Sequence, residues 1–133
     1  MKKILLIVLL LSFGFSQKLT EVVETYDNGN IKSITYHKKT RTGIEKVKDE
    51  KYYENGQKEE EGTYKGGKPD GKYTTWYENG QKKSEGTYKV WIKDGLYTEW
   101  YETGQKLIEG TYKDGERISA ECWDEDGNEI ECD

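Results

Sequence analysis

The stretch Tyr77-Glu78-Asn79-Gly80-Gln81-Lys82 decides the fold, because near-copies of it recur at a constant spacing. These copies begin at Tyr53 and Tyr101, each 24 residues away. A second marker, Glu-Gly-Thr-Tyr-Lys, keeps the same period and begins at Glu61, Glu85 and Glu109. Two markers that share one period over three copies indicate a tandem array of repeats.

Each repeat has the pattern of two strands joined by turns. Asn-Gly between alternating segments favours a two-residue type I′ turn, which needs positive φ at both central residues. We therefore expect such turns at Asn55-Gly56 and Asn79-Gly80, with Thr103-Gly104 as a weaker version. The Gly- and Pro-containing segment Gly66 to Gly71 predicts a longer loop. The fold class is all-β: an elongated, single-layer antiparallel meander of about ten short strands.

A two-residue turn also fixes which side chains face each other across the strands. It places Tyr77 opposite Lys82, Thr75 opposite Ser84, Tyr73 opposite Gly86, and Gly71 opposite Tyr88. The next repeat places Tyr97 opposite Gly110 and Tyr112 opposite Gly95. Each ring can then lie over the bare backbone of a glycine. The predicted structural residues of the repeats are Gly62, Tyr64, Gly71, Tyr73, Tyr77, Gly86, Tyr88, Gly95, Tyr97, Tyr101, Gly110 and Tyr112.

The first residues resemble a secretory signal peptide rather than part of the fold. A basic Lys2-Lys3 head precedes an apolar run from Ile4 to Leu11, and small residues follow at Gly14 and Ser16. The run is shorter than the roughly 20 residues of a membrane span. Cleavage after Ser16 would move the formal net charge from −5 to about −7. The predicted organisation is a signal peptide (1–16), a degenerate N-terminal repeat or cap (17–47), three repeats (48–117) and a capping hairpin (118–133).

The segment Glu61 to Tyr73 resembles the MORN repeat (membrane occupation and recognition nexus), whose unit has Gly and aromatic residues at matching positions. The box Trp76 to Lys82 is similar to the bacterial variant of this repeat, found in proteins often labelled antitoxin components. Two departures stand out: Val90-Trp91-Ile92 replaces the Gly-bearing loop, and Glu116 to Ser119 lacks the second Gly. The resemblance covers about Lys48 to Asp133 and implies scaffold or binding roles without catalysis.

The tryptophans are the candidate ligand-binding residues: Trp76, Trp91, Trp100 and Trp123. Indoles on an open sheet stack on sugars or on a protein partner, whereas the alternative is packing across neighbouring strands. Trp91 is the best candidate for binding, because it lies in a predicted loop.

Cys122 and Cys132 are predicted to form a disulfide that closes the C-terminal end, with a free pair as the alternative. A two-residue turn at Asp126-Gly127 would leave the two cysteines on opposite faces. A three-residue loop through Asn128 would place them directly opposite each other.

Several residues that suggest chemistry have simpler explanations. His37 has no partner histidine for a metal site or a catalytic triad. Asp124, Asp126 and Asn128 are spaced like the start of a calcium loop, but Gly127 comes too early and the sequence ends before the bidentate Glu position. No pair of carboxylates stands out as catalytic. We therefore predict no enzyme activity, no metal and no cofactor.

Three classes of function fit this sequence. The first is a protein-interaction scaffold of the cell envelope, with an antitoxin or immunity protein as a subtype, since an acidic chain suits a basic partner. The second is a carbohydrate- or cell-wall-binding module that uses the periodic aromatic residues. The third is a membrane-lipid-associated protein, which the negative charge disfavours, as it disfavours nucleic acid. The predicted localisation is periplasmic, cell-envelope or extracellular.

Overall fold

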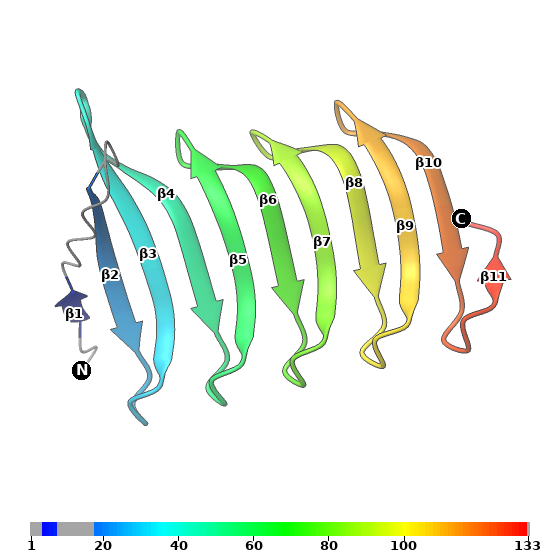
Figure 1. Cartoon of the computed structure of the whole chain (residues 1–133), viewed down its shortest axis with the longest axis horizontal. Coiled ribbons are helices and arrows are strands. Elements are labelled where there is room, and N and C mark those ends of the chain that lie inside the picture. Colours follow the sequence, from blue (N-terminus) through cyan, green and yellow to red (C-terminus); the bar gives the residue numbers. More distant parts are fainter. Residues whose placement is uncertain (1–3, 8–17, 133) are drawn as a thin grey trace.

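The structure is a computed structural model that describes residues 4–7 and 18–132. Its strands form one antiparallel sheet in which every strand pairs with its neighbours in sequence, so the chain is a continuous meander (Figure 1). The strands are β1 (Ile4–Ile7), β2 (Leu19–Thr25), β3 (Ile31–Thr40), β4 (Gly43–Tyr52), β5 (Lys58–Lys65), β6 (Lys68–Trp76), β7 (Lys82–Lys89), β8 (Ile92–Trp100), β9 (Lys106–Lys113), β10 (Glu116–Trp123) and β11 (Glu129–Ile130). The predicted all-β, single-layer meander is confirmed.

Among the residues that the structure describes, no second layer covers either face of this sheet. In the described part of the chain only Val23, Tyr97 and Cys122 are buried hydrophobic residues, and no side chain is fully buried. Stability must therefore come from the ladder of backbone hydrogen bonds and from contacts between side chains of adjacent strands. The described part of the chain contains no helix long and apolar enough to cross a membrane.

The predicted signal peptide lies mostly outside the described residues. The part that is described, Ile4–Ile7, pairs antiparallel with β2, from Ile4 opposite Glu24 to Ile7 opposite Glu21. The division of the chain into signal peptide, cap, repeats and capping hairpin stays a prediction. The proposed boundary at residue 117 falls inside β10.

Two kinds of turn alternate along the sheet. We call the turns at the bottom of Figure 1 the lower turns; they lie at residues 26–30, 53–57, 77–81, 101–105 and 124–128. The upper turns lie at residues 40–43, 65–68, 89–92 and 113–116 (Figure 1).

The lower turns are not the two-residue type I′ turns that the Asn-Gly pairs predict. At Asn79-Gly80 the Tyr77 N–H donates to Gln81 O (2.8 Å) and the Gly80 N–H donates to Tyr77 O (2.9 Å), which leaves a three-residue loop. Only Gly80 has a positive φ, +86°. The predicted pairing of Tyr77 with Lys82 is therefore wrong, because Trp76 lies opposite Lys82.

A bulge then restores the predicted register. The pairing shifts by one residue between Thr75 and Trp76, so that Lys83 has no partner across the ladder. Beyond this bulge Thr75 lies opposite Ser84, Tyr73 opposite Gly86, and Gly71 opposite Tyr88, as predicted. The loop adds one residue and the bulge absorbs it.

The upper turns at residues 65–68, 89–92 and 113–116 have the geometry that was expected of the lower ones, with positive φ at both central residues. Lys65 pairs with Lys68 around Gly66 and Gly67, whose φ values are +56° and +77°, so this is a two-residue turn with positive φ at both positions. The predicted loop from Gly66 to Gly71 is therefore wrong, since β6 already begins at Lys68. Pro69 is accommodated because the β5–β6 register shifts between Gly62 and Tyr64, and proline is tolerated beside a bulge.

Candidate functional site

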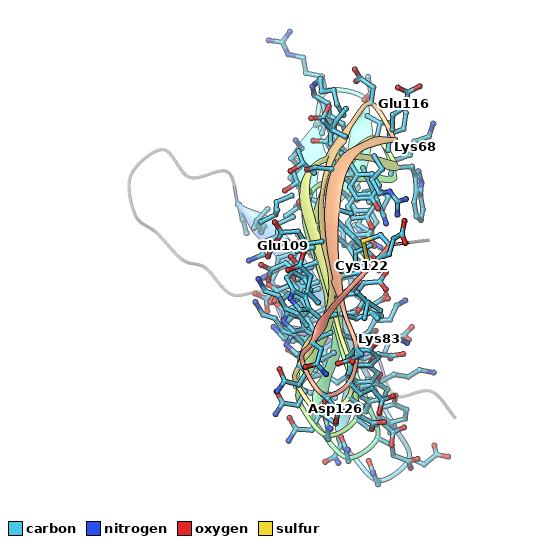
Figure 2. All side chains as sticks on the ribbon, turned by 90° about the vertical axis from the view of Figure 1, so that its right-hand side faces the viewer. Lys68, Lys83, Glu109, Glu116, Cys122 and Asp126 are labelled. Carbon is cyan, nitrogen blue, oxygen red and sulfur yellow. A yellow bond between two sulfur atoms is a disulfide. The ribbon has the colours of Figure 1, made fainter. Side chains whose placement is uncertain are left out.

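The two faces of the sheet carry different side chains. The face that we call the tyrosine face carries Tyr64, Tyr73, Tyr88, Tyr97 and Tyr112, and the opposite face, the tryptophan face, carries Trp76, Trp100 and Trp123. Seen along the sheet, Lys83 and Cys122 lie on one side and Glu109 on the other (Figure 2).

Rings lie over glycines on the tyrosine face, though not the rings that were predicted. A Cβ added to Gly86 would meet Tyr97 Cδ2 at 2.5 Å, so the covering ring comes from β8 and not from Tyr73. A Cβ on Gly62 would meet Tyr73 Cδ2 at 2.3 Å. Pairing alone did not reveal the choice, because Gly86 lies opposite Tyr73 on β6 and opposite Tyr97 on β8.

The other predicted ring–glycine pairs are also only partly realised. Gly71 lies opposite Tyr88 in the ladder, but a Cβ there would meet Thr63 Oγ1 at 2.5 Å and not the ring. Tyr97 lies opposite Gly110 and Tyr112 opposite Gly95, as predicted. The rings instead contact each other edge to face, with centroids 6.1 Å apart for Tyr73–Tyr88 and 5.8 Å for Tyr97–Tyr112.

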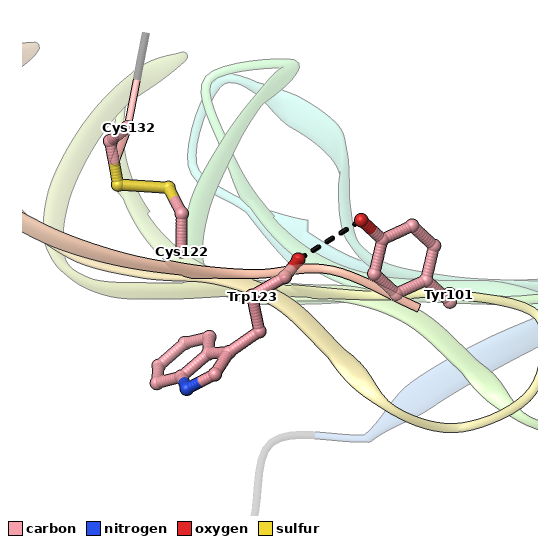
Figure 3. Close-up of a disulfide and its surroundings, with 4 residues drawn as sticks. All are labelled: Tyr101, Cys122, Trp123 and Cys132. Atoms are coloured by element: carbon pink, nitrogen blue, oxygen red, sulfur yellow. Dashed lines mark hydrogen bonds between the residues drawn. A yellow bond between two sulfur atoms is a disulfide. The ribbon is translucent and has the colours of Figure 1, made fainter. Parts of the chain in front are cut away.

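A tyrosine at the start of a lower turn forms a hydrogen bond to the strand end that precedes the next lower turn. The Tyr53, Tyr77 and Tyr101 hydroxyls donate to the carbonyl oxygens of Trp76, Trp100 and Trp123, at 2.8, 2.8 and 3.0 Å (Figure 3 shows the last of these). The Asn79 amide joins the same connection, since its Oδ1 accepts from the Gln81 N–H (2.9 Å) and its Nδ2 donates to Glu102 O (2.9 Å). The Tyr-Glu-Asn-Gly-Gln box therefore links repeats to one another.

Three of the four candidate tryptophans are half-buried and lie beneath lysine side chains, an arrangement that the sequence did not predict. Lysine ammonium groups lie over their rings, at 5.6 Å for Lys58–Trp76, 5.6 Å for Lys82–Trp100 and 5.4 Å for Lys106–Trp123. Each of these lysines also pairs with the glutamate three residues on, at 2.7, 2.7 and 2.9 Å. The 24-residue spacing of the lysines was visible in the sequence, but the register that brings them to the rings was not. Packing is the better account of these three indoles.

Trp91 differs from the other three tryptophans. It lies in the upper turn between β7 and β8 with 64% of its surface exposed, next to Val90 (45%) and Ile92 (48%). Val90 and Trp91 have φ values of +50° and +75°, where the equivalent upper turn has Gly66 and Gly67. Positive φ is rare and strained for a β-branched residue. A strained, exposed apolar turn is the feature of this molecule most typical of a binding site.

Cys122 and Cys132 form the predicted disulfide. The Cys122 side chain lies on the tyrosine face, and the Trp123 side chain points to the opposite face (Figure 3). Neither predicted register is right, because Cys122 lies opposite Ile130. The last turn is another three-residue lower turn, in which the Asp124 N–H donates to Asn128 O (2.9 Å). Cys132 lies two residues beyond the paired position and reaches Cys122 from the same face.

The acidic residues of this last turn hold the turn together. Asp124 Oδ1 accepts from the backbone N–H groups of Asp126 (3.0 Å) and Asn128 (2.8 Å). The hydrogen bond from the Asn128 side chain lowers the Asp124 pKa most, and these backbone hydrogen bonds lower it further. His37 lies half-buried in β3, opposite Thr20 and Lys46. Within residues 4–7 and 18–132, no group of three or more His, Cys, Asp or Glu side chains is arranged to hold a metal ion.

A single-layer sheet of stacked hairpins with a 24-residue period is a β-hairpin repeat protein. Comparison with protein families gives the particular class: the model of the MORN repeat variant matches residues 48–65, 69–89 and 93–114. The chain is a MORN-repeat protein, of a family that is in general a non-catalytic binding repeat. No curated protein and no solved structure matches the chain.

Proposed function

We propose that this chain is an exported protein-interaction scaffold of the cell envelope. The observation that carries the proposal is the upper turn of Val90, Trp91 and Ile92, which keeps three exposed apolar side chains where its neighbours have Gly66-Gly67-Lys68 and Asp114-Gly115-Glu116. Exposed aromatic anchors in a rigid turn are typical of binding hot spots. The disulfide supports export, because such bonds persist mainly in oxidising compartments.

A matched variant tests the proposal without endangering the fold. Val90→Gly with Trp91→Gly copies the Gly66-Gly67 turn of the preceding repeat and removes the strain at positive φ. Its stability is expected to equal or slightly exceed that of the wild type. Leu96→Ser is the control, since it removes another exposed apolar side chain (57%) at a different place.

Cross-linking capture from the organism's own envelope extract, followed by quantitative mass spectrometry, provides the measurement. We expect specific proteins to be retained by the wild type and by Leu96→Ser, and to be depleted about tenfold with the Val90→Gly/Trp91→Gly protein. Recovery of the same proteins with all three chains would contradict the proposal. A toxin among the retained proteins would support the antitoxin or immunity subtype.

Binding of carbohydrate is the second candidate, and Trp91 now carries most of it. Lysines lie over the other three indoles, whereas Trp91 presents an exposed ring that can stack on a sugar. Sedimentation with purified peptidoglycan separates the two functions. Binding that Trp91→Ala abolishes would favour the wall polymer over a protein partner. The third candidate, lipid association, is tested by flotation with anionic vesicles, where the net charge predicts no binding.

A further inference from the structure

The lower half of the tyrosine face contains a hollow of about 420 Å³ that spans several strands. The hydroxyls of Thr75 on β6 and Ser84 on β7 lie 2.7 Å apart in this hollow and satisfy each other. Tyr53, Tyr77 and Tyr97 line it with aromatic surface, and Glu59, Glu60 and Glu99 line it with carboxylates. The hollow thus combines aromatic rings with negative charge.

Two of the three carboxylates form no ion pair among the described residues, although Lys93, whose ammonium lies 3.3 Å from the centre of the Tyr97 ring, is close enough to Glu99 for the two charges to interact. Glu60 pairs with Lys51, and Glu99 accepts a hydrogen bond from the Tyr97 hydroxyl (2.5 Å). In the part of the chain that the structure describes, neither Glu59 nor Glu99 forms an ion pair. Lys83 is the lysine that lines the hollow, and its ammonium lies 5.5 Å from the centre of the Tyr77 ring. The residues that line the hollow include three carboxylates and one lysine, so the lining keeps a net negative charge.

The charge affects the neighbouring tyrosines in the expected direction. Burial, followed by the Glu99 carboxylate, raises the pKa of Tyr97. Burial, followed by Glu59, raises the pKa of Tyr53. Both carboxylates therefore act on the hollow from opposite sides, one from β5 and one from β8.

We infer that this hollow binds an arginine side chain of a protein partner. A guanidinium is planar, so it stacks on tyrosine rings, and its fork of N–H donors matches a carboxylate. Arginine is favoured over lysine because two separated carboxylates and the half-buried rings of Tyr53 and Tyr77 reward a wide, flat cation more than a point charge. This inference rests on the proposed protein-binding function and adds the chemistry of the partner, a basic segment.

A short peptide serves as the probe in a binding titration with the full chain. The acetylated peptide Gly-Arg-Gly-Arg-Gly is compared with the same peptide carrying citrulline, which has the shape of arginine without its charge, and with the lysine peptide. We expect the citrulline peptide to bind at least about tenfold more weakly than the arginine peptide, with the lysine peptide in between. Equal binding of the arginine and citrulline peptides would overturn the inference.

Substitutions in and beside the hollow give effects of opposite sign. Glu99→Gln keeps an acceptor for the Tyr97 hydroxyl and removes a charge, so the arginine peptide should bind about fivefold to tenfold more weakly. Lys83→Gln removes the like charge and should strengthen binding. Glu125→Gln, in the last lower turn and away from the hollow, changes the net charge equally and should leave binding within about twofold. Equal losses for Glu99→Gln and Glu125→Gln, or weaker binding for Lys83→Gln, would reduce the effect to unspecific attraction and refute the site.

The two proposals fail separately. Failure of the arginine peptide to bind, with partner capture still dependent on Val90 and Trp91, removes the arginine site and leaves the scaffold function standing. Binding of the peptide without any protein captured from the envelope removes the scaffold function.

Discussion

The tyrosine and tryptophan faces are built from the same strands with the same period, yet they satisfy their side chains differently. On the tryptophan face each of Lys58, Lys82 and Lys106 lies over an indole and pairs with a glutamate of its own strand. On the tyrosine face the rings cover glycines and one another, and lysines lie over some of them as well, Lys46 over Tyr64 and Lys93 over Tyr97 and Tyr112. The difference lies in the carboxylates: Glu59 and Glu99 form no ion pair among the described residues, whereas Glu61, Glu85 and Glu109 on the tryptophan face are all paired.

This difference explains why aromatic residues at regular spacing are a poor guide to binding sites. The periodic tryptophans were the prominent candidates in the sequence, but the same regularity that made them visible reflects their role in packing between repeats. The features best suited to binding break the period. Val90-Trp91 replaces a Gly-Gly turn, and Lys83 and Leu107 stand where Glu59 stands in the first matched repeat.

The largest effect is expected from alkaline pH acting on the tyrosine face. Burial raises the pKa values of Tyr64, Tyr73 and Tyr97 above the ordinary value, with neighbouring carboxylates adding to it. The folded state then binds more protons than the unfolded state once the pH exceeds about 10, so stability is complete below that pH and declines above it. Each tyrosine contributes at most about 1.4 kcal/mol per pH unit. Denaturant titrations between pH 9 and 12, with tyrosinate absorbance followed in parallel, should show ionisation and unfolding together. Full ionisation near pH 10 in a folded chain would contradict the burial of these rings.

Gly62→Ala tests the contact between ring and glycine directly. The added methyl would lie 2.3 Å from Tyr73 Cδ2, so the ring must move, and we expect a loss of about 2–3 kcal/mol in the free energy of unfolding. Combining it with Tyr73→Leu should cost less than the two single substitutions together, because the overlap disappears. Additive costs would mean that the ring does not lie over Gly62.

Reduction of the disulfide should act on the C-terminal end of the tyrosine face alone. Its cysteines are 10 residues apart, so loss of the bond should cost about 2–3 kcal/mol. Hydrogen exchange of the Cys132→Ser protein should rise in β10 and β11 and stay unchanged in β5 and β6. Two free thiols in the purified protein, found by mass spectrometry, would remove this prediction.

The smallest effect separates two adjacent lysines on opposite faces. Lys82→Met removes a cation from the Trp100 ring and a salt bridge to Glu85, which should cost about 0.5–1 kcal/mol and shift the tryptophan fluorescence. Lys83→Met on the tyrosine face should change stability by less than about 0.5 kcal/mol. Equal effects of the two substitutions would contradict the distinction between the faces.

Much of the fold could be predicted from local pattern, while the turn geometry could not. The pairings of Tyr73 with Gly86 and of Gly71 with Tyr88 follow from alternation and period, and they are correct. The two-residue turn predicted at Asn79-Gly80 is wrong because the Asn79 side chain forms hydrogen bonds to the Gln81 N–H and to the next lower turn. These hydrogen bonds favour a three-residue loop. That preference depends on a neighbouring repeat, and a rule for isolated hairpins does not include it.

The amino-acid sequence by itself determined the all-β class, the order of the strands and the positions of rings and glycines, because strand alternation and the 24-residue period are local properties of the chain. Tertiary structure alone decided which ring covers Gly86, how Cys132 reaches Cys122, and where the carboxylates of β5 and β8 meet around one hollow. These outcomes depend on bulges and on contacts between adjacent repeats, which shift a side chain by one position and so change its neighbours without changing the pattern.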